Sequence, residues 1–179
     1  MNIRPVSLKD ISSIAMIQSA VWQTTYQKNF PAEIITQLTP EFFYENIATG
    51  IKNYTDGTLP QIIWLVAEID DTVVGHIVAG PARRTHEFTN YGEIRVLNIH
   101  PDYHRKKIGH KLITQALTEL EKQYKTVYLK VVEDNTKAQQ FYQQHGFHDS
   151  GIRHHDTFME HPLINAVYIK GETHGKTMD

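Results

Sequence analysis

Residues 93–132 constrain the fold of this chain more than any other stretch. An apolar, β-rich run at 93–99 leads into a basic turn, and apolar residues then recur at helical spacing from Ile108 to Leu120. A second β-rich run follows at 127–132. A strand, a helix and a strand in this order predict a right-handed crossover between two parallel strands of one sheet.

Further helices and strands are expected on both sides of this crossover. Residues 2–6 alternate like a first or edge strand, and Ser7 and Asp10 have the spacing of a capping box that begins a helix reaching about Tyr26. The remaining expected elements are helices at 32–38, 41–53 and 135–145, with Thr39 as N-cap of the second, and strands at 61–69, 72–79, 147–152 and 166–169.

This order predicts an α/β (α+β) fold with a mixed central sheet of six to seven strands flanked by helices. A chain of 179 residues, 40% of them hydrophobic, fits one domain, which we expect over residues 1–170, with a polar C-terminal tail at 171–179. Because the chain contains no cysteine, disulfides, thiolate zinc sites and cysteine nucleophiles are excluded.

Charge and hydropathy exclude further classes. A formal net charge of −2 argues against a nucleic-acid partner, which usually requires a basic excess. No apolar run approaches the roughly 18 residues of a membrane span. The start MNIRPVSLKD lacks a signal-peptide pattern, so a cytoplasmic protein with no membrane partner is expected. The 11 histidines form no recognised ligand spacing, and no metal is expected.

The basic turn inside the crossover predicts a phosphate site. The first turn of a helix has N–H groups without helical acceptors and a partial positive charge, both of which suit an anion. Here the turn carries His104, Arg105, Lys106 and Lys107, and Gly109 leaves room for a phosphate near the backbone. The alternative is a solvated basic turn with Gly109 serving only in packing. The glycine patterns of Walker A and Rossmann nucleotide sites are absent.

Two stretches resemble motifs of a known family. VLNIHPDYHRKKIGHKLI at 96–113 and EDNTKAQQFYQQHGF at 133–147 resemble motifs A and B of the GNAT superfamily of acetyl-CoA-dependent N-acetyltransferases. The two stand in the family's order, with a strand between them. The family's glutamine or arginine falls on His104 and its first glycine on Lys107, whereas Gly109 keeps the last small residue.

The resemblance implies a fold, a reaction and a co-substrate. The fold is that of acyl-CoA N-acyltransferases, with two parallel strands that splay apart. The reaction is direct transfer of an acetyl group from acetyl-CoA to a primary amine of a small molecule or peptide. By the same resemblance, acetyl-CoA is bound by Leu97, Asn98, Ile99, His104, Arg105, Lys106, Lys107, Ile108, Gly109, His110, Asn135 and Tyr142.

The resemblance also suggests catalytic roles, each beside a plainer one. Tyr142 matches the family's general acid, or is an ordinary core tyrosine. Asn135 matches the residue that bonds the pantetheine arm, and is also a natural N-cap. Glu93 is the best carboxylate for a general base, acting directly or through water, or is a solvated strand end. Arg95 is an alternative group that orients an acidic part of the acceptor.

Two further alternatives concern the acceptor and the activity itself. Trp22 and Tyr26, four residues apart on one helix face, either line an apolar acceptor slot or pack between the first two helices. Lys107 in place of glycine favours a second hypothesis, a non-catalytic acyl-CoA-binding regulatory domain. The family resemblance is also compatible with a homodimer.

Overall fold

The strands of this protein form one mixed sheet in the order β1-β2-β3-β4-β5-β7-β6. The computed structural model describes residues 1–59, 61–84 and 86–171. Its strands are β1 (Asn2–Pro5), β2 (Ile63–Ile69), β3 (Thr72–Pro81), β4 (Gly92–Ile99), β5 (Thr126–Val132), β6 (His148–Phe158) and β7 (His161–Gly171). Its helices are η1 (Leu8–Asp10), α1 (Ile11–Thr25), α2 (Ala32–Gln37), α3 (Pro40–Thr55), η2 (Pro101–Tyr103), α4 (Ile108–Leu120) and α5 (Thr136–Gln143). The fold class predicted from the sequence is confirmed; beyond Gly171, the predicted tail lies outside the described residues.

The parallel crossover is formed by β4, α4 and β5. Gly92 pairs with Val127, Glu93 with Tyr128 and Ile94 with Leu129, all in parallel register. The apolar face that predicted α4 is buried throughout, at Ile108, Leu112, Ile113, Ala116, Leu117 and Leu120. Burial of that stripe holds the helix in place, as expected for an amphipathic helix on a sheet.

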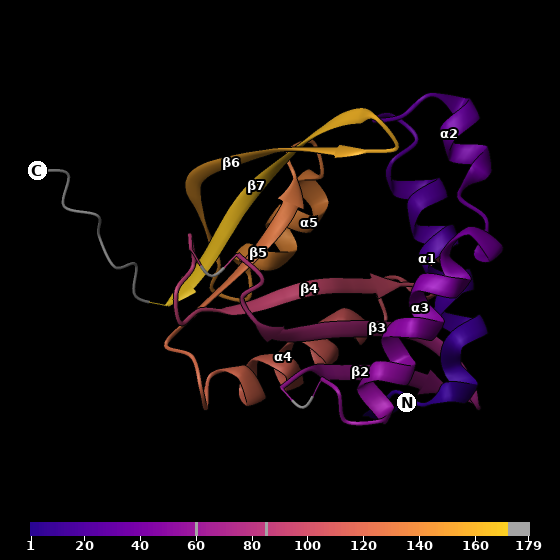
Figure 1. Ribbon diagram of the computed structural model, residues 1–179, viewed down its shortest axis with the longest axis horizontal. Helices are drawn as coiled ribbons and strands as arrows, with labels where there is room; N and C mark the ends of the chain where they lie inside the picture. Colours follow the sequence, from indigo (N-terminus) through magenta and orange to yellow (C-terminus); the bar gives the residue numbers. More distant parts are fainter. Residues whose placement is uncertain (60, 85, 172–179) are drawn as a thin grey trace, which may run out of the picture. The chain divides into compact units, whose positions relative to one another are not determined.

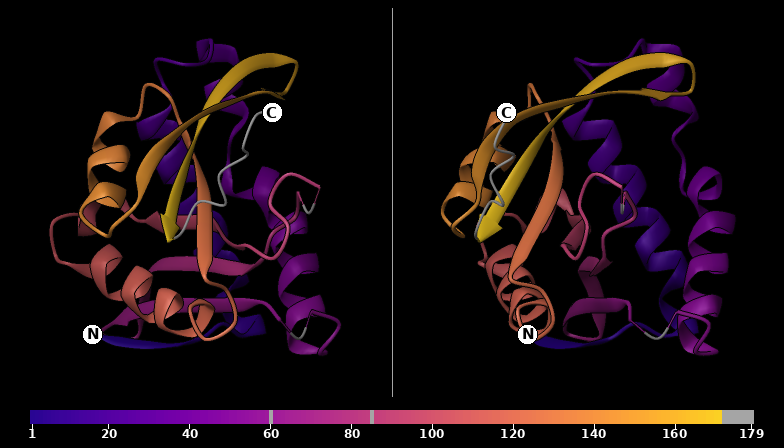
Figure 2. Two further views of the ribbon diagram at one scale, coloured as in Figure 1. Left: turned by 90° about the vertical axis from the view of Figure 1, so that its left-hand side faces the viewer. Right: turned by 60° about the vertical axis from the view of Figure 1, so that its left-hand side comes forward.

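The chain divides into two compact units, Met1–Ala79 with Arg95–Leu117 and Gly80–Ile94 with Thr118–Asp179. In the first unit, β1, β2 and β3 pair antiparallel, and α1 and α3 run side by side (Figures 1 and 2). The predicted single domain over 1–170 stays a prediction. Among the described residues, no helix combines the length and apolar character that crossing a membrane requires.

Helices cover both faces of β2 and β3. The Trp64 ring lies 3.2 Å from the point where Gly50 of α3 would carry a β-carbon, so α3 packs on the face of Trp64. Gly75 pairs with Ala67 and therefore belongs to the opposite face, where its nearest neighbours include Ile108 of α4. Alternate side chains of β2 and β3 therefore point to opposite faces of the sheet, one covered by α3 and the other by α4.

The start of the chain is fixed by the predicted capping box. Asp10 accepts hydrogen bonds from the Ser7 amide and hydroxyl at 2.8 and 2.9 Å. Both Asp10 oxygens also bind the Arg4 guanidinium, which in turn reaches Glu68 of β2. These contacts tie the first turn before α1 to the sheet and lower the pKa of the buried Asp10 carboxyl.

The second unit contains the hairpin of β6 and β7, which Figure 2 shows as a long twisted ribbon. One apolar cluster of this unit contains Ala82, Phe88, Tyr128, Val167 and Ile169. The sequence-based bounds of these two strands, 147–152 and 166–169, were wrong because they were too short. Both strands extend through polar residues that the apolar pattern does not mark, and β6 contains a register shift between Asp149 and Arg153.

Candidate active site

The basic turn before α4 adopts a backbone conformation that favours anion binding. Arg105 and Lys107 both have positive φ angles, 61° and 59°, the left-handed conformation that glycine adopts most readily. The helix follows at once, since the Lys111 amide donates to the Lys107 carbonyl at 3.1 Å. Alternation of left-handed residues with ordinary ones turns successive N–H groups toward one side, which makes a concave site for an anion.

The turn before α4 is also positively charged. His104, Arg105, Lys106 and Lys107 are all exposed, whereas Ile108 is buried and anchors the first turn of the helix. A helix start leaves the N–H groups of its first residues without acceptors inside the helix. Backbone donors, the helix dipole and three permanent cations therefore converge on one exposed turn.

Short-range contacts fix the shape of this turn. The His104 ring nitrogen Nε2 lies 3.1 Å from the Ile99 carbonyl oxygen at the end of β4. The Lys106 ammonium lies 4.5 Å from the centre of the Tyr103 ring, within the range of a cation–π contact. The turn is thus held both to the strand before it and to its own preceding 3₁₀-helix.

The residues of β4 expected to bind the co-substrate lie directly before the turn. Leu97, Asn98 and Ile99 are all partly exposed. The Asn98 side-chain amide donates to Gln18 of α1 at 3.1 Å, so this side chain already has a structural partner. A β-carbon on Gly75 of β3 would lie 2.6 Å from Ile99 Cδ1 and 3.0 Å from the Asn98 carbonyl oxygen, so β3 approaches β4 closely at these residues.

Helix α5 and the N-cap before it contain the two predicted residues of motif B. The Asn135 side chain accepts a hydrogen bond from the Ala138 amide at 3.2 Å, so its role as an N-cap is confirmed. Its amide nitrogen is a separate donor, which capping does not use. Tyr142 is partly exposed, and its ring makes edge contacts with Phe141 and Phe147 at centroid distances of 5.5 and 6.0 Å.

Glu93 has a partner that the sequence did not reveal. The carboxylate is 2% exposed, and the Arg83 guanidinium donates to both of its oxygens, at 2.6 Å to Oε1 and 3.1 Å to Oε2. The Arg83 amide adds a third hydrogen bond at 2.9 Å. Burial, followed by the nearby Glu93 charge, raises the pKa of Tyr128. The solvated-strand-end alternative is therefore wrong, and the role of general base stays a prediction.

Trp22 and Tyr26 belong to an aromatic cluster in the first unit. Their ring centroids lie 4.7 Å apart, and Trp22 also lies 6.0 Å from Phe30 and 6.1 Å from Phe43. Phe30 and Phe43 are buried core residues. The two rings therefore pack against residues before α2 and in α3 rather than against α2 itself, and an acceptor slot at Trp22 and Tyr26 stays a prediction.

Comparison with known families decides the identity of this arrangement. The model of the acetyltransferase (GNAT) family matches residues 22–147, more than half of the 179-residue chain. The chain belongs to the GNAT family. No match was found among curated proteins.

Solved structures have the same fold as this GNAT protein. PaiA N-acetyltransferase from Thermoplasma acidophilum, in complex with coenzyme A, is 24% identical, with a TM-score of 0.74 over 96% of this chain and 98% of its own. Ribosomal-protein-alanine N-acetyltransferase from Brucella melitensis is 19% identical, with a TM-score of 0.73 over 96% and 100%. YncA from Salmonella typhimurium, with its cofactor acetyl-CoA, is 17% identical, with a TM-score of 0.72 over 98% and 96%.

Sequence reasoning predicted a candidate site for this GNAT protein but missed two features of the structure there. One is the left-handed backbone at Arg105 and Lys107, which their side-chain types do not indicate. The other is Arg83, which lies 10 residues from Glu93 across a connecting segment and belongs to neither motif. In the described part of the chain, no group of three metal-ligating side chains is found.

Proposed function

We propose that this GNAT protein is an N-acetyltransferase that moves an acetyl group from acetyl-CoA directly to a primary amine of a small molecule or peptide. The observation that supports it most is the turn at residues 104–110. There, four basic residues precede α4, two of them, Arg105 and Lys107, have a left-handed backbone, and the chain belongs to this family. We include the expectation of a cytoplasmic enzyme in this proposal.

The turn is proposed to bind the diphosphate of the co-substrate. The N–H groups from Lys107 to His110 donate to the phosphate oxygens, and the dipole of α4 adds a favourable field. Arg105, Lys106 and Lys107 neutralise the charge from the solvent side. On β4, backbone groups of Leu97, Asn98 and Ile99 pair with the pantetheine arm like an added strand, and an N–H there stabilises the oxyanion at the thioester carbonyl.

Lys107 does not by itself favour the non-catalytic alternative. Its φ of 59° is one that glycine adopts most readily, and the turn has this conformation with a lysine in place. Its N–H remains available as a donor, and its side chain adds a cation. We therefore prefer the catalytic proposal.

Transfer requires two proton movements. The neutral amine nitrogen attacks the thioester carbon, the carbon–sulfur bond breaks, and the amine loses a proton. We propose that Tyr142 gives its hydroxyl proton to the departing thiolate. Because Arg83 binds both oxygens of Glu93, we propose that Glu93 receives the amine proton only by way of water.

Release of free thiol from acetyl-CoA, measured against a panel of primary amines, tests the activity. We expect turnover with at least one amine and none without an acceptor.

Tyr142→Phe keeps the ring contacts with Phe147 and removes only the hydroxyl, so we expect turnover to fall by about 10²-fold. An unchanged pH–rate profile in this variant contradicts the acid role; cofactor binding without turnover on any amine supports the regulatory alternative.

The role of the turn is tested separately by kinetics. Lys106→Ala and Lys107→Ala should raise the KM for acetyl-CoA more than they lower kcat, because these side chains act in ground-state binding. The effect should weaken as salt is added, since the side chains are exposed. The exposed Lys125, changed to alanine, is a matched control that should alter neither constant. A loss confined to kcat argues against the proposed role.

A further inference from the structure

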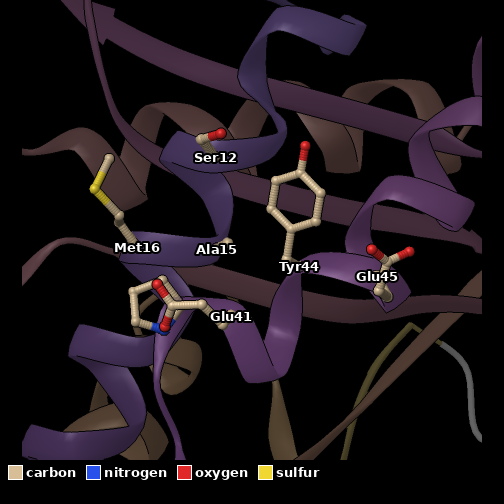
Figure 3. A pocket seen from close by; sticks show the side chains of 7 residues that line it. Ser12, Ala15, Met16, Glu41, Tyr44 and Glu45 are labelled. Atoms are coloured by element: carbon tan, nitrogen blue, oxygen red, sulfur yellow. The ribbon is translucent and has the colours of Figure 1, made fainter.

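A cavity lies between α1 and α3, within the first unit. Its volume is about 560 Å³, which falls in the range of small-molecule sites in proteins. Figure 3 shows how the side chains of the two helices line it. Helix α1 contributes Ser12, Ala15 and Met16, and α3 contributes Pro40, Glu41, Tyr44 and Glu45.

The apolar part of this cavity is exposed to solvent. The side chains of Met16 and Tyr44 are large, yet 52% and 40% of their surface is accessible, whereas Ala15 at the base is buried. Covering such surface with an apolar group is favourable by about 25 cal/mol per Å² removed from water. The cavity thus offers a contact for a short hydrocarbon arm.

The charged part of the cavity is negative. Glu41 and Glu45 stand on the two sides of the Tyr44 ring in Figure 3, and the lining contains no lysine or arginine. Hydrogen bonds from its own amide and from the Thr39 hydroxyl hold the Glu41 carboxylate and lower its pKa. Glu45 is exposed and has no hydrogen bond or ion pair with any described residue.

We propose that this α1–α3 cavity binds an organic ammonium ion, a positively charged nitrogen on a short alkyl arm. The ammonium group meets the face of Tyr44 and the free carboxylate of Glu45, and the arm lies on Met16 and Ala15. A hard metal ion does not fit this lining, because two carboxylates beside an aromatic ring and a thioether supply too few oxygen ligands. The carboxylates repel anions.

This inference does not rest on the proposed acetyl transfer. None of the seven lining residues belongs to the turn at 104–110, to β4 or to α5. A ligand that contacts both α1 and α3 stabilises their packing, so binding should raise the melting temperature of the protein without acetyl-CoA. Failure of one proposal therefore leaves the other standing.

Titration of the whole protein with butylammonium chloride, followed by NMR of the methionine methyl groups, tests the site. We expect the Met16 methyl signal to move and saturate at millimolar concentrations, while the signal of Met159, which does not line the cavity, stays in place. The neutral 1-butanol should bind at least tenfold more weakly. Equal affinity for butanol, or no saturable shift at Met16, overturns the proposal.

Matched variants identify the groups responsible. Glu45→Gln removes the charge and keeps the shape, and Tyr44→Leu removes the ring; each should weaken butylammonium binding at least fivefold. Glu33→Gln, on an exposed carboxylate of α2 outside the cavity, should leave the affinity unchanged. Unchanged affinity in Glu45→Gln, or an equal loss in Glu33→Gln, contradicts a built site and indicates general attraction to a negative surface.

Discussion

Lys107 has a left-handed backbone conformation that glycine adopts more readily than lysine. Its φ of 59° costs a residue with a β-carbon free energy that glycine does not lose. In exchange, the position gains a cation at the proposed diphosphate site. Stability of the fold therefore favours glycine at position 107, whereas the proposed binding of the co-substrate favours lysine.

Lys107→Gly should separate these two effects. Relief of the left-handed strain should raise the free energy of unfolding by up to about 1 kcal/mol, after the greater flexibility of glycine in the unfolded chain is subtracted. Loss of the cation should raise the KM for acetyl-CoA. Denaturant melts and kinetics measure the two. Lys106→Gly, at a neighbour without positive φ, is the control and should be destabilised; equal destabilisation of both variants would contradict the strain argument.

His76 makes the stability of the protein depend on pH. It lies in β3 with both ring nitrogens buried and without hydrogen-bond partners among the described residues. Burial lowers its pKa from 6.5 to about 4. The unfolded chain therefore binds a proton at a higher pH than the folded protein does, and stability is lost as pH falls from 6.5 toward 4.

Comparison with His76→Phe isolates this contribution. Between pH 7 and pH 4 the wild-type protein should lose on the order of 3 kcal/mol more stability than the variant, because only its unfolded state gains the proton of His76. Unfolding free energies by denaturant at each pH measure the difference. His155→Gln, at an exposed position, should follow the wild type. Parallel pH curves for wild type and His76→Phe would remove His76 as the cause.

At the scale of elements, the N-terminus of α5 combines a structural and a proposed binding role in one side chain. Asn135 caps the helix through its oxygen, whereas the proposed bond to pantetheine uses its nitrogen. Asn135→Asp keeps an oxygen for the cap and removes the donor. We expect its free energy of unfolding to change little and its KM for acetyl-CoA to rise.

Asn135→Ala is the matched comparison, since it removes both groups. It should cost about 1 kcal/mol of stability in addition to the rise in KM. Thermal melts and initial rates on the same preparations separate the two effects. If Asn135→Asp leaves the KM unchanged, the residue is only a cap.

Most elements followed from local patterns in the sequence. The capping box at Ser7, the N-caps Thr39 and Asn135 and the stripe of α4 depend on neighbouring residues, and all were confirmed. The length of the β6–β7 hairpin was underestimated because polar contacts stabilise much of it. Asp156 of β6, for example, binds Lys130 of β5 at 2.6 Å, a pairing between distant residues that no local period indicates.

The same limit applies to the candidate site: residues in contiguous motifs were indicated by the sequence, and long-range partners were not. The turn at 104–110, Asn135 and Tyr142 lie in contiguous motifs, so the sequence indicated them. The Arg83–Glu93 pair and the backbone of Lys107 depend on tertiary packing and on dihedral angles, which residue types alone do not specify. Side-chain types therefore predicted a co-substrate site more clearly than they predicted a route for the proton in the proposed transfer.

At the scale of the whole molecule, the charge on the turn is a local feature. The formal net charge is −2, so the proposed attraction of a polyanionic co-substrate would depend on residues 104–107 rather than on the protein as a whole. Binding should consequently be specific to the ligand whose diphosphate and pantetheine arm fit the turn and β4 together. General polyanions should bind weakly.

The most direct test of the account is calorimetric titration of the protein with CoA, ATP and NAD under identical salt. The account predicts saturable binding of CoA and no comparable binding of ATP or NAD, with CoA affinity lowered in a Lys106→Ala, Lys107→Ala double variant. Tighter binding of ATP or NAD than of CoA, or unchanged CoA affinity in the double variant, would contradict it.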